Sequence, residues 1–293
     1  MYLNNKIGIV ILNYNDFKTT ERLSKLISGY VVIDKIVIVD NLSTDNSFQN
    51  LQKLKSKKLE ILQSNKNGGY SYGNNYGAFY LIEKYNIDIL FIANPDVIFD
   101  ETFIKIIVED LLTNKAQLIS GVMLNSDGNE SEFDYTISSY VEELLNCTIL
   151  IKNLIKFFKR KKQWRSEGDL IFYERIPGSL FGIKSNIYKK IKGLDDNVFL
   201  YCEESILSAK LKKFNYLTAV DKRTSYKHLH SVSINKSLNR IKIIEQFYKS
   251  HLYYHKTYNN IGNIKLQIMK LFMFYGVLVR KVIFKILYWV GEK

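Results

Sequence analysis

The sequence predicts an α/β fold with a mostly parallel central sheet, helices on both of its faces, and a helical extension at the C-terminal end. Three observations lead to this class. Apolar runs alternate with amphipathic helical patterns over the first 125 residues, as in a parallel sheet with crossover helices. The apolar runs are nearly continuous, which indicates strands that are covered on both sides. After residue 235 only helical patterns remain.

The predicted elements follow in order along the chain. Strands are predicted at 7–12, 35–40, 59–62, 88–93 and 118–124, and helices at 16–27, 47–57 and 103–112. Residues 125–134 are rich in Asn, Ser, Asp and Gly and therefore form a connection with turns. A helix at 141–162 precedes a strand, a helix, a loop and a helix within 176–216. We therefore predict a first domain at 1–235 and a helical, basic C-terminal region at 236–293.

The composition indicates an anionic partner and a reducing compartment. Lys and Arg outnumber Asp and Glu by 42 to 29, a formal net charge of +13. Such an excess favours nucleic acid, an anionic membrane or a phosphorylated substrate. The cysteines, Cys147 and Cys202, have no Cys-x-x-Cys spacing and are expected to be buried thiols. The first residues lack the pattern of a secretory signal, so we expect a cytoplasmic protein, peripheral at the inner face of the cell membrane.

Polar residues follow each early strand at the edge where an open α/β sheet binds its ligands. The first strand leads into Asn13 and Asn15, and the second ends in Asp40 and Asn41. A carboxylate at this place can accept the imide proton of uracil or thymine. The alternative is helix capping by the neighbouring Ser43 or Thr44, which does not explain Asp40 and Asn41 themselves.

The third strand is followed by a glycine-rich stretch, "NGGYSYGNN", that contains Asn67, Gly69 and Asn74. Glycines allow the backbone to approach a diphosphate or ribose closely, although an ordinary flexible turn would contain them too. The dinucleotide pattern G-x-G-x-x-G is absent after the first strand, where the chain reads "NYNDF". The phosphate loop G-x-x-x-x-G-K-[ST] is also absent. A dehydrogenase is therefore disfavoured.

The ordered set "VILNYN", "VDNLSTDNS", "NGGYSYGNNYGA", "NPDV" and "FLYCEES" resembles the family 2 inverting glycosyltransferases, in particular the rhamnosyltransferase-like branch of bacterial surface polysaccharide synthesis. The resemblance covers residues 6–233. It implies a GT-A fold, a nucleotide-sugar donor and a divalent cation, Mg²⁺ or Mn²⁺. It also implies a nucleotide-sugar site made of Asn13, Asn15, Asp40, Asn41, Asn67, Gly69, Asn74 and Asn94. With Asp40 as the acceptor from uracil or thymine, we expect a UDP- or dTDP-sugar donor.

By this resemblance, Asn94-Pro95-Asp96 takes the place of the family's Asp-x-Asp motif. Hard divalent cations prefer oxygen ligands and typically bridge a carboxylate and substrate phosphates, so Asp96 is the implied metal ligand. Asn94 replaces the first aspartate, which leaves fewer charges at the metal. Standing alone, the motif would instead be interpreted as a turn that caps the next helix.

The resemblance also implies a base and a second metal ligand. Glu204, with Glu203 as the alternative, takes the place of the base that accepts the proton of the acceptor hydroxyl. The family places an aspartate and an arginine further on, where this chain has Ile206 and Lys210. Two acids that stabilise the first turn of a helix are the structural alternative. His228, five residues before Ser233, is preferred to His230 as a metal ligand, and a purely hydrogen-bonded histidine is the alternative.

Two stretches suit an anionic membrane surface. Residues 152–165 mix Lys and Arg with Leu, Ile, Phe and Trp, and residues 264–290 mix aromatic and aliphatic side chains with basic ones. A solvated face would also explain the first stretch, and a packed helical hairpin or a homo-oligomer contact through Gly276 the second. A membrane surface would suit a lipid-linked glycan acceptor.

Two other protein classes remain to be weighed. A nucleic-acid-binding protein would carry its basic residues on a docking element, whereas here they lie partly in apolar-rich helices, so we expect no nucleic acid partner. A catalytically weak, glycosyltransferase-like scaffold at the membrane is the alternative that Asn94 and Ile206 favour. The sugar, the acceptor, the linkage position and the oligomeric state are not determined by the sequence.

Overall fold

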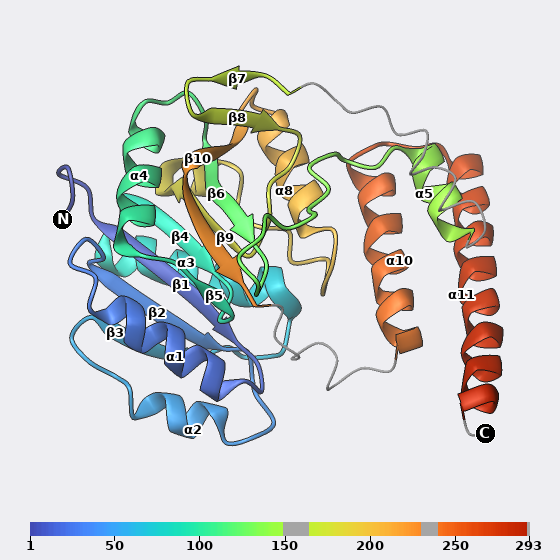
Figure 1. Cartoon of the computed structure of the whole chain (residues 1–293), viewed down its shortest axis with the longest axis horizontal. Coiled ribbons are helices and arrows are strands. Elements are labelled where there is room, and N and C mark those ends of the chain that lie inside the picture. Colours follow the sequence, from blue (N-terminus) through green and yellow to red (C-terminus); the bar gives the residue numbers. More distant parts are fainter. Residues whose placement is uncertain (149–163, 230–239, 292–293) are drawn as a thin grey trace. The chain divides into compact units, whose positions relative to one another are not determined.

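The computed structural model describes residues 1–148, 164–229 and 240–291 (Figure 1). The chain forms two compact units. The first contains Met1–Thr136, Trp164–Phe199 and Glu203–Ser233, and the second contains Ile137–Gln163, Leu200–Cys202 and Ile234–Lys293. Most of the basic stretch predicted at 152–165 lies outside the described residues, as do His230 and Ser233.

The described strands of the first unit belong to one sheet, in the order β3-β2-β1-β4-β9-β6-β10-β8-β7, with β5 paired to β10. Their bounds are β1 Ile7–Asn13, β2 Lys35–Asp40, β3 Leu59–Gln63, β4 Ile89–Ala93, β5 Val97–Ile98, β6 Leu118–Leu124, β7 Ser166–Glu167, β8 Leu170–Tyr173, β9 Leu180–Lys184 and β10 Thr218–His228.

The helices of the first unit connect these strands along the chain. They are α1 Phe17–Ser28, α2 Ser47–Gln52, α3 Gly69–Tyr85, α4 Glu101–Leu112, α7 Ser185–Lys190 and α8 Glu203–Lys212. The α/β class and the helices on both faces of the sheet are confirmed. The sheet is parallel from β3 to β4 and mixed beyond, because β9 runs antiparallel to both β4 and β6.

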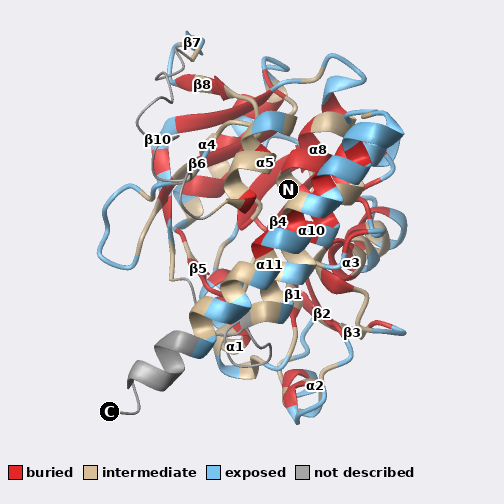
Figure 2. Cartoon of the chain, turned by 90° about the vertical axis from the view of Figure 1, so that its right-hand side faces the viewer, coloured by how far each residue is buried: buried red, intermediate tan, exposed pale blue. Residues whose placement is uncertain are grey.

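Alternating side chains of the parallel strands build two apolar cores, one on each face of the sheet. Ile9 and Ile11 of β1 belong to the core that also contains residues of α1 and α4. Val10, between them, belongs to the core with residues of α3, α7 and α8. Side chains of successive strand residues point to opposite faces, so burial on both faces requires the continuous apolar runs seen in the sequence. Much of the sheet is accordingly coloured as buried in Figure 2.

Helix α3 was not predicted as a helix, because its first turns are the glycine-rich stretch. Gly69, Gly73 and Gly77 recur every four residues and so lie on one face of the helix. A Cβ atom on Gly77 would lie 2.7 Å from Val39 and 2.8 Å from Val10. The glycines therefore let α3 pack closely on β1 and β2, and the interpretation of this stretch as a flexible turn was wrong.

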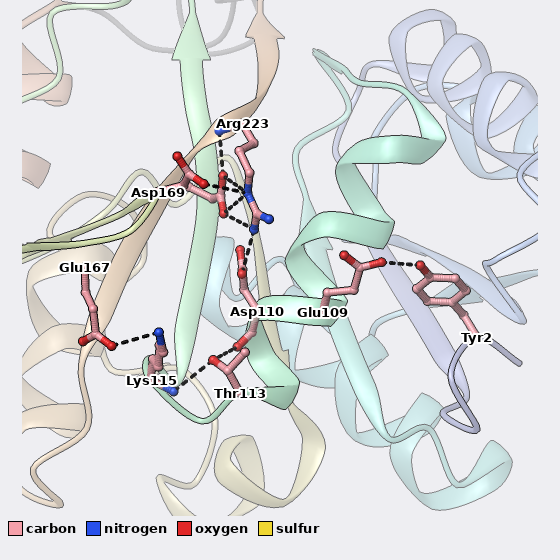
Figure 3. Close-up of polar contacts among 9 residues, drawn as sticks. Tyr2, Glu109, Asp110, Thr113, Lys115, Glu167, Asp169 and Arg223 are labelled. Carbon is pink, nitrogen blue, oxygen red and sulfur yellow. Dashed lines mark hydrogen bonds and ion pairs between the residues drawn. The ribbon is translucent and has the colours of Figure 1, made fainter.

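One polar cluster ties α4 to the bulged strand β10 (Figure 3). The Arg223 guanidinium donates to the buried Asp221 at 2.6 Å and to Asp110 at 2.8 Å. Burial, followed by a hydrogen bond with Asp221 and the charge of that residue, raises the pKa of Asp110 to about 7. The Arg223 guanidinium helps to hold the pKa of Asp221 below its usual value despite burial.

Asp110 is expected to make the folded chain less stable as the pH rises, and replacing it with asparagine should abolish this pH dependence. Asp110 with a raised pKa holds its proton in the folded chain but not in the unfolded chain from about pH 4 to about pH 7, so the free energy of unfolding falls as the pH rises through this window. The free energy of unfolding of the variant, relative to that of the wild type, should be about 1–3 kcal/mol higher at about pH 8 than at about pH 5. Urea unfolding at both pH values measures this. Asp169→Asn, an exposed partner of the same arginine, is the control, and an equal wild-type-to-variant difference at both pH values would contradict the assignment.

The second unit is helical in the described residues, with α5 Tyr140–Cys147, α10 Arg240–Thr257 and α11 Asn263–Gly291. Its core contains Cys147, Tyr248, Met269 and Met273. Gly276 permits close packing here, since an added Cβ would lie 2.7 Å from the Tyr248 hydroxyl. No helix among the described residues has the length and apolar character needed to cross a membrane. Both cysteines are buried thiols, as predicted.

Candidate functional site

The carboxyl ends of β1, β2 and β4 meet at one edge of the sheet, because these strands are parallel and adjacent. Asn13 and Asp40 are paired in the β-ladder, and the Asn13 amide donates to the Asp40 carboxylate at 2.9 Å. The predicted residues that follow each strand are therefore brought to the same edge. This is the place where ligands bind to open α/β sheets.

Asp40 is fully buried and its carboxylate orders the loop that follows β2. Ser43 donates to it twice, from its backbone amide at 2.9 Å and from its hydroxyl at 2.6 Å. Ser43 therefore binds the Asp40 carboxylate and does not cap α2, whose N-cap residue is Asn46. The predicted capping by Ser43 or Thr44 was wrong. Recognition of a base by Asp40 stays a prediction.

Asn15 joins the loop after β1 to the loop after β2. Its backbone amide donates to the Ser43 hydroxyl at 2.9 Å, and its side-chain oxygen accepts from the Thr44 amide at 2.8 Å. Asn15 has a φ of 53°, a left-handed conformation that asparagine tolerates well. The two loops thus form one hydrogen-bonded rim.

Asn41 connects the end of β2 to the start of α3. Its side-chain amide donates to the Asn67 side chain at 3.0 Å and to the Gly69 carbonyl at 3.1 Å. Gly69 has a φ of 85°, and a Cβ there would lie 1.9 Å from the Phe199 carbonyl oxygen, so only glycine fits. Asn74 is buried one turn along α3 and donates to the Tyr70 carbonyl at 3.0 Å.

Asp96 and His228, the two predicted metal ligands, lie together although 132 positions separate them in the sequence. The Asp96 Oδ1 is 3.2 Å from the His228 Nε2. Pairing of β5 with β10, in which Val97 lies opposite His228, brings them to this place. Asp96 does not cap α4, because Asp100 does so by accepting from the Phe103 amide. The capping alternative for Asp96 was therefore wrong.

This pair fits a divalent cation that is shared with a substrate. Among the described residues, no group of three or more His, Cys, Asp or Glu side chains is placed to hold a metal by itself. One carboxylate and one imidazole supply an anionic oxygen and a nitrogen that can bind Mg²⁺ or Mn²⁺ when phosphate oxygens complete the coordination.

Glu203 and Glu204 form the first turn of α8 beside the Pro177-Gly178 segment. Glu203 is buried, whereas Glu204 is half-buried and lies against Gly178, where an added Cβ would be 3.1 Å from its Oε1. The Tyr70 hydroxyl donates to the Gly178 carbonyl at 2.6 Å. Burial, and then the charges of Glu204 and Glu203, raise the pKa of Tyr70 well above its ordinary value, so it remains a hydrogen-bond donor.

Gly178 and Ser179 connect the Asn94-Pro95-Asp96 motif to Glu204. The Asn94 amide donates to the Ser179 carbonyl at 2.7 Å, and Gly178, the neighbour of Ser179, contacts Glu204. Asn94-Pro95-Asp96 and α8 are thus held by the same short segment.

Sequence reasoning missed Tyr70, Arg175 and Gly178. Arg175 donates to the Ser205 hydroxyl at 3.1 Å and to the Asp134 carbonyl at 2.8 Å, which braces the first turn of α8. The glycine-rich stretch could have suggested Tyr70, which follows Gly69. No pattern in the sequence pointed to Arg175, because its partners are distant along the chain.

Two consecutive residues before α8 adopt a left-handed conformation. Tyr201 and Cys202 both have a φ of 72°, which costs a non-glycine residue about 1–2 kcal/mol each. Strain of this kind gathers at functional sites. By contrast, a cavity of about 390 Å³ lined by Asp88, Lys184 and Asn186 lies at the other end of β4 and contains none of the predicted site residues.

The fold is that of the GT-A glycosyltransferases. A crystal structure of GalNAc-T7 with UDP, GalNAc and Mn²⁺ is 12% identical, has a TM-score of 0.61 and matches 88% of this chain and 50% of that chain. The mannosyltransferase PcManGT from Pyrobaculum calidifontis, with GDP-Man and Mn²⁺, is 11% identical, has a TM-score of 0.59 and matches 94% of this chain and 74% of that one.

The chain belongs to glycosyl transferase family 2, whose model matches residues 8–180. A relative of known role is the low-salt glycan biosynthesis hexosyltransferase Agl10 of Haloferax volcanii, 27% identical over 201 residues, which are 68% of this chain. The match spans 59% of that relative's length. The resemblance to family 2 that the motifs indicated is confirmed.

Proposed function

We propose that the chain is an inverting glycosyltransferase that moves one rhamnosyl or hexosyl unit from a UDP- or dTDP-sugar to a hydroxyl of a growing, lipid-linked bacterial surface glycan. This glycan would be a capsule, an O-antigen or a cell-wall polysaccharide. One observation carries the proposal. Asp96 and His228 lie 3.2 Å apart, and the motif that contains Asp96 is bonded to the segment that positions Glu204.

The comparisons support a nucleotide-sugar donor. The GalNAc-T7 structure contains UDP and the PcManGT structure contains GDP-Man, each with Mn²⁺, and Agl10 is a hexosyltransferase of glycan biosynthesis. Asn13, Asn15 and Asp40 form the rim proposed to receive the nucleoside. Asn41, Asn67, Gly69, Asn74 and Asn94 complete the proposed donor site.

Asp96 and His228 would hold the Mg²⁺ or Mn²⁺ ion. When bound, the cation would neutralise charge on the departing nucleoside diphosphate. Because Asn94 is neutral, Asp96 supplies the anionic oxygen of this motif, and removing its charge should affect donor binding strongly.

Glu204 acts as the base. Its carboxylate accepts the proton of the acceptor hydroxyl while the acceptor oxygen forms a bond to the anomeric carbon. The bond from that carbon to the diphosphate breaks on the opposite side, so the anomeric configuration inverts and the nucleoside diphosphate leaves. Tyr70 and Arg175 hold the segments on either side of Glu204, and they are positioning residues.

Product analysis tests the direction of attack. The full chain with Mn²⁺ is incubated with UDP-, dTDP- and GDP-sugars and a lipid extract that contains lipid-linked glycans. We expect one UDP- or dTDP-sugar to be consumed and the new linkage to have the anomeric configuration opposite to that of the donor. Proton NMR of the product measures this configuration. Retention would contradict the inverting mechanism. Transfer from a GDP-sugar alone would contradict the proposal that the donor carries uracil or thymine.

A further inference from the structure

Helix α11 has apolar side chains on two opposite faces. Leu266, Met269 and Met273 are buried, and the two methionines belong to the core of the second unit. A second set of large apolar side chains is exposed: Ile264, Ile268, Leu271, Tyr275, Leu278 and Val282. Much of the described part of α11 is accordingly coloured as exposed in Figure 2. The packing of the unit explains the first face but leaves the second without a cover among the described residues.

The exposed set forms a continuous stripe. Its members are spaced by four and three residues in turn, which keeps them on one side of a helix with 3.6 residues per turn. At about 1.5 Å per residue the stripe is about 27 Å long. Phe274, 70% exposed, widens it beside Leu271, 68% exposed. The other exposed large apolar residues of the described chain, such as Val31, form no comparable series at helical spacing.

Lysines border the stripe. At 100° per residue, Lys270 and Lys281 lie along one border and Lys265 along the other. Helix α11 contains no acidic residue. Arg280 does not belong to this border, because its guanidinium points inward and donates to the Tyr248 hydroxyl at 2.8 Å. Lys281 is ion-paired with Glu245 of α10 at 3.3 Å, so Lys270 on one border and Lys265 on the other carry the net positive charge. The surface is therefore apolar along its centre and carries a lysine charge on each border.

We propose that this stripe is the face by which the chain lies on an anionic membrane, with α11 in the plane of the interface. Apolar side chains would enter the boundary between headgroups and acyl chains, while lysine stems extend toward anionic headgroups. A second copy of the chain would bring the same positive borders together with no acidic residue of α11 to pair with them. A lipid surface supplies both an apolar layer and negative charge.

The inference rests on the proposed function in one respect, the lipid-linked acceptor, and it names the surface that would bring the chain to that acceptor. It does not depend on any step of the transfer. Membrane binding and donor binding are therefore measured separately on the same protein.

The test is co-sedimentation of the full chain with vesicles of phosphatidylcholine and phosphatidylglycerol, and with vesicles of phosphatidylcholine alone. We expect the wild type to bind the mixed vesicles more tightly. The variant Leu271→Gln/Phe274→Gln/Leu278→Gln should lose about 100-fold in vesicle affinity, because three inserted side chains become polar. Replacing the exposed residues Leu26, Val31 and Leu217 of the first unit with Gln is the matched control and should leave vesicle binding unchanged.

A second variant keeps the test decisive if the first does not fold. Lys265→Gln/Lys270→Gln retains the apolar stripe and the Lys281–Glu245 ion pair, and it should lower affinity for the mixed vesicles while leaving binding to phosphatidylcholine unchanged. Wild-type affinity in the apolar variant, or no vesicle binding by the wild type, would overturn the proposal. A lipid-free dimer that the apolar variant dissociates, measured by sedimentation velocity, would overturn it in favour of a second copy. Unchanged donor binding in both variants separates these outcomes from a failure of the proposed transferase activity.

Discussion

Replacing Asp96 with alanine is expected to lower kcat/KM for sugar transfer by at least about 10³-fold and to remove the dependence of donor binding on the metal. Asp96 is the acidic residue of Asn94-Pro95-Asp96, and its carboxylate lies 3.2 Å from His228. Without it, only the imidazole of the pair remains to hold a cation. Transfer rates, and donor affinity measured with Mn²⁺ and with chelator, give the two quantities.

The matched control for Asp96→Ala is Asp127→Asn, which removes a carboxylate from the exposed loop after β6. This control should transfer sugar at the wild-type rate. Thermal unfolding of both variants shows whether a loss of activity reflects a loss of folding. Metal-dependent donor binding and full turnover in Asp96→Ala would contradict the metal role of this residue.

Glu204→Gln is expected to keep donor binding and to lower the transfer rate by about 10²–10⁴-fold. Glutamine has nearly the same shape as glutamate but cannot take up the proton of the sugar acceptor's hydroxyl. Because the contact with Gly178 is retained, the start of α8 should keep its position. A rate constant for transfer, measured at saturating donor, separates this effect from a change in affinity.

Glu203→Gln is the internal comparison, since the two carboxylates occupy the same helical turn. Glu203 is the more buried of the two, so its substitution should affect stability more and transfer less. A severe loss of transfer in Glu203→Gln with full activity in Glu204→Gln would move the base to Glu203.

The parallel part of the fold was predictable because its signals are local. Continuous apolar runs identified β1, β2 and β4, since each strand is buried on both faces. Helix α3 escaped prediction because the same glycines that suggest a turn also allow a helix to pack closely on valines of two strands. The antiparallel position of β9 between β4 and β6 depends on pairing between distant segments, and no local pattern encodes it.

The candidate site was predictable only in part, for the same reason. The polar strand ends were visible, and the resemblance to a family named Asp96 and His228, which the structure brings together. The support of Glu204 by Gly178 and Tyr70 was not visible, because Tyr70 and Gly178 are 108 positions apart. Ser43 was interpreted as a helix cap because its hydrogen bond to the buried Asp40 carboxylate cannot be inferred from the local sequence alone.

The measurement that tests the central claim most directly is a calorimetric titration of the full chain with a panel of UDP-, dTDP- and GDP-sugars, with Mn²⁺ and with chelator. A metal-dependent transferase of this class should bind one UDP- or dTDP-sugar in the micromolar range with Mn²⁺ and lose that binding with chelator. Failure to bind any nucleotide sugar would contradict the account and leave a GT-A fold that serves as a scaffold.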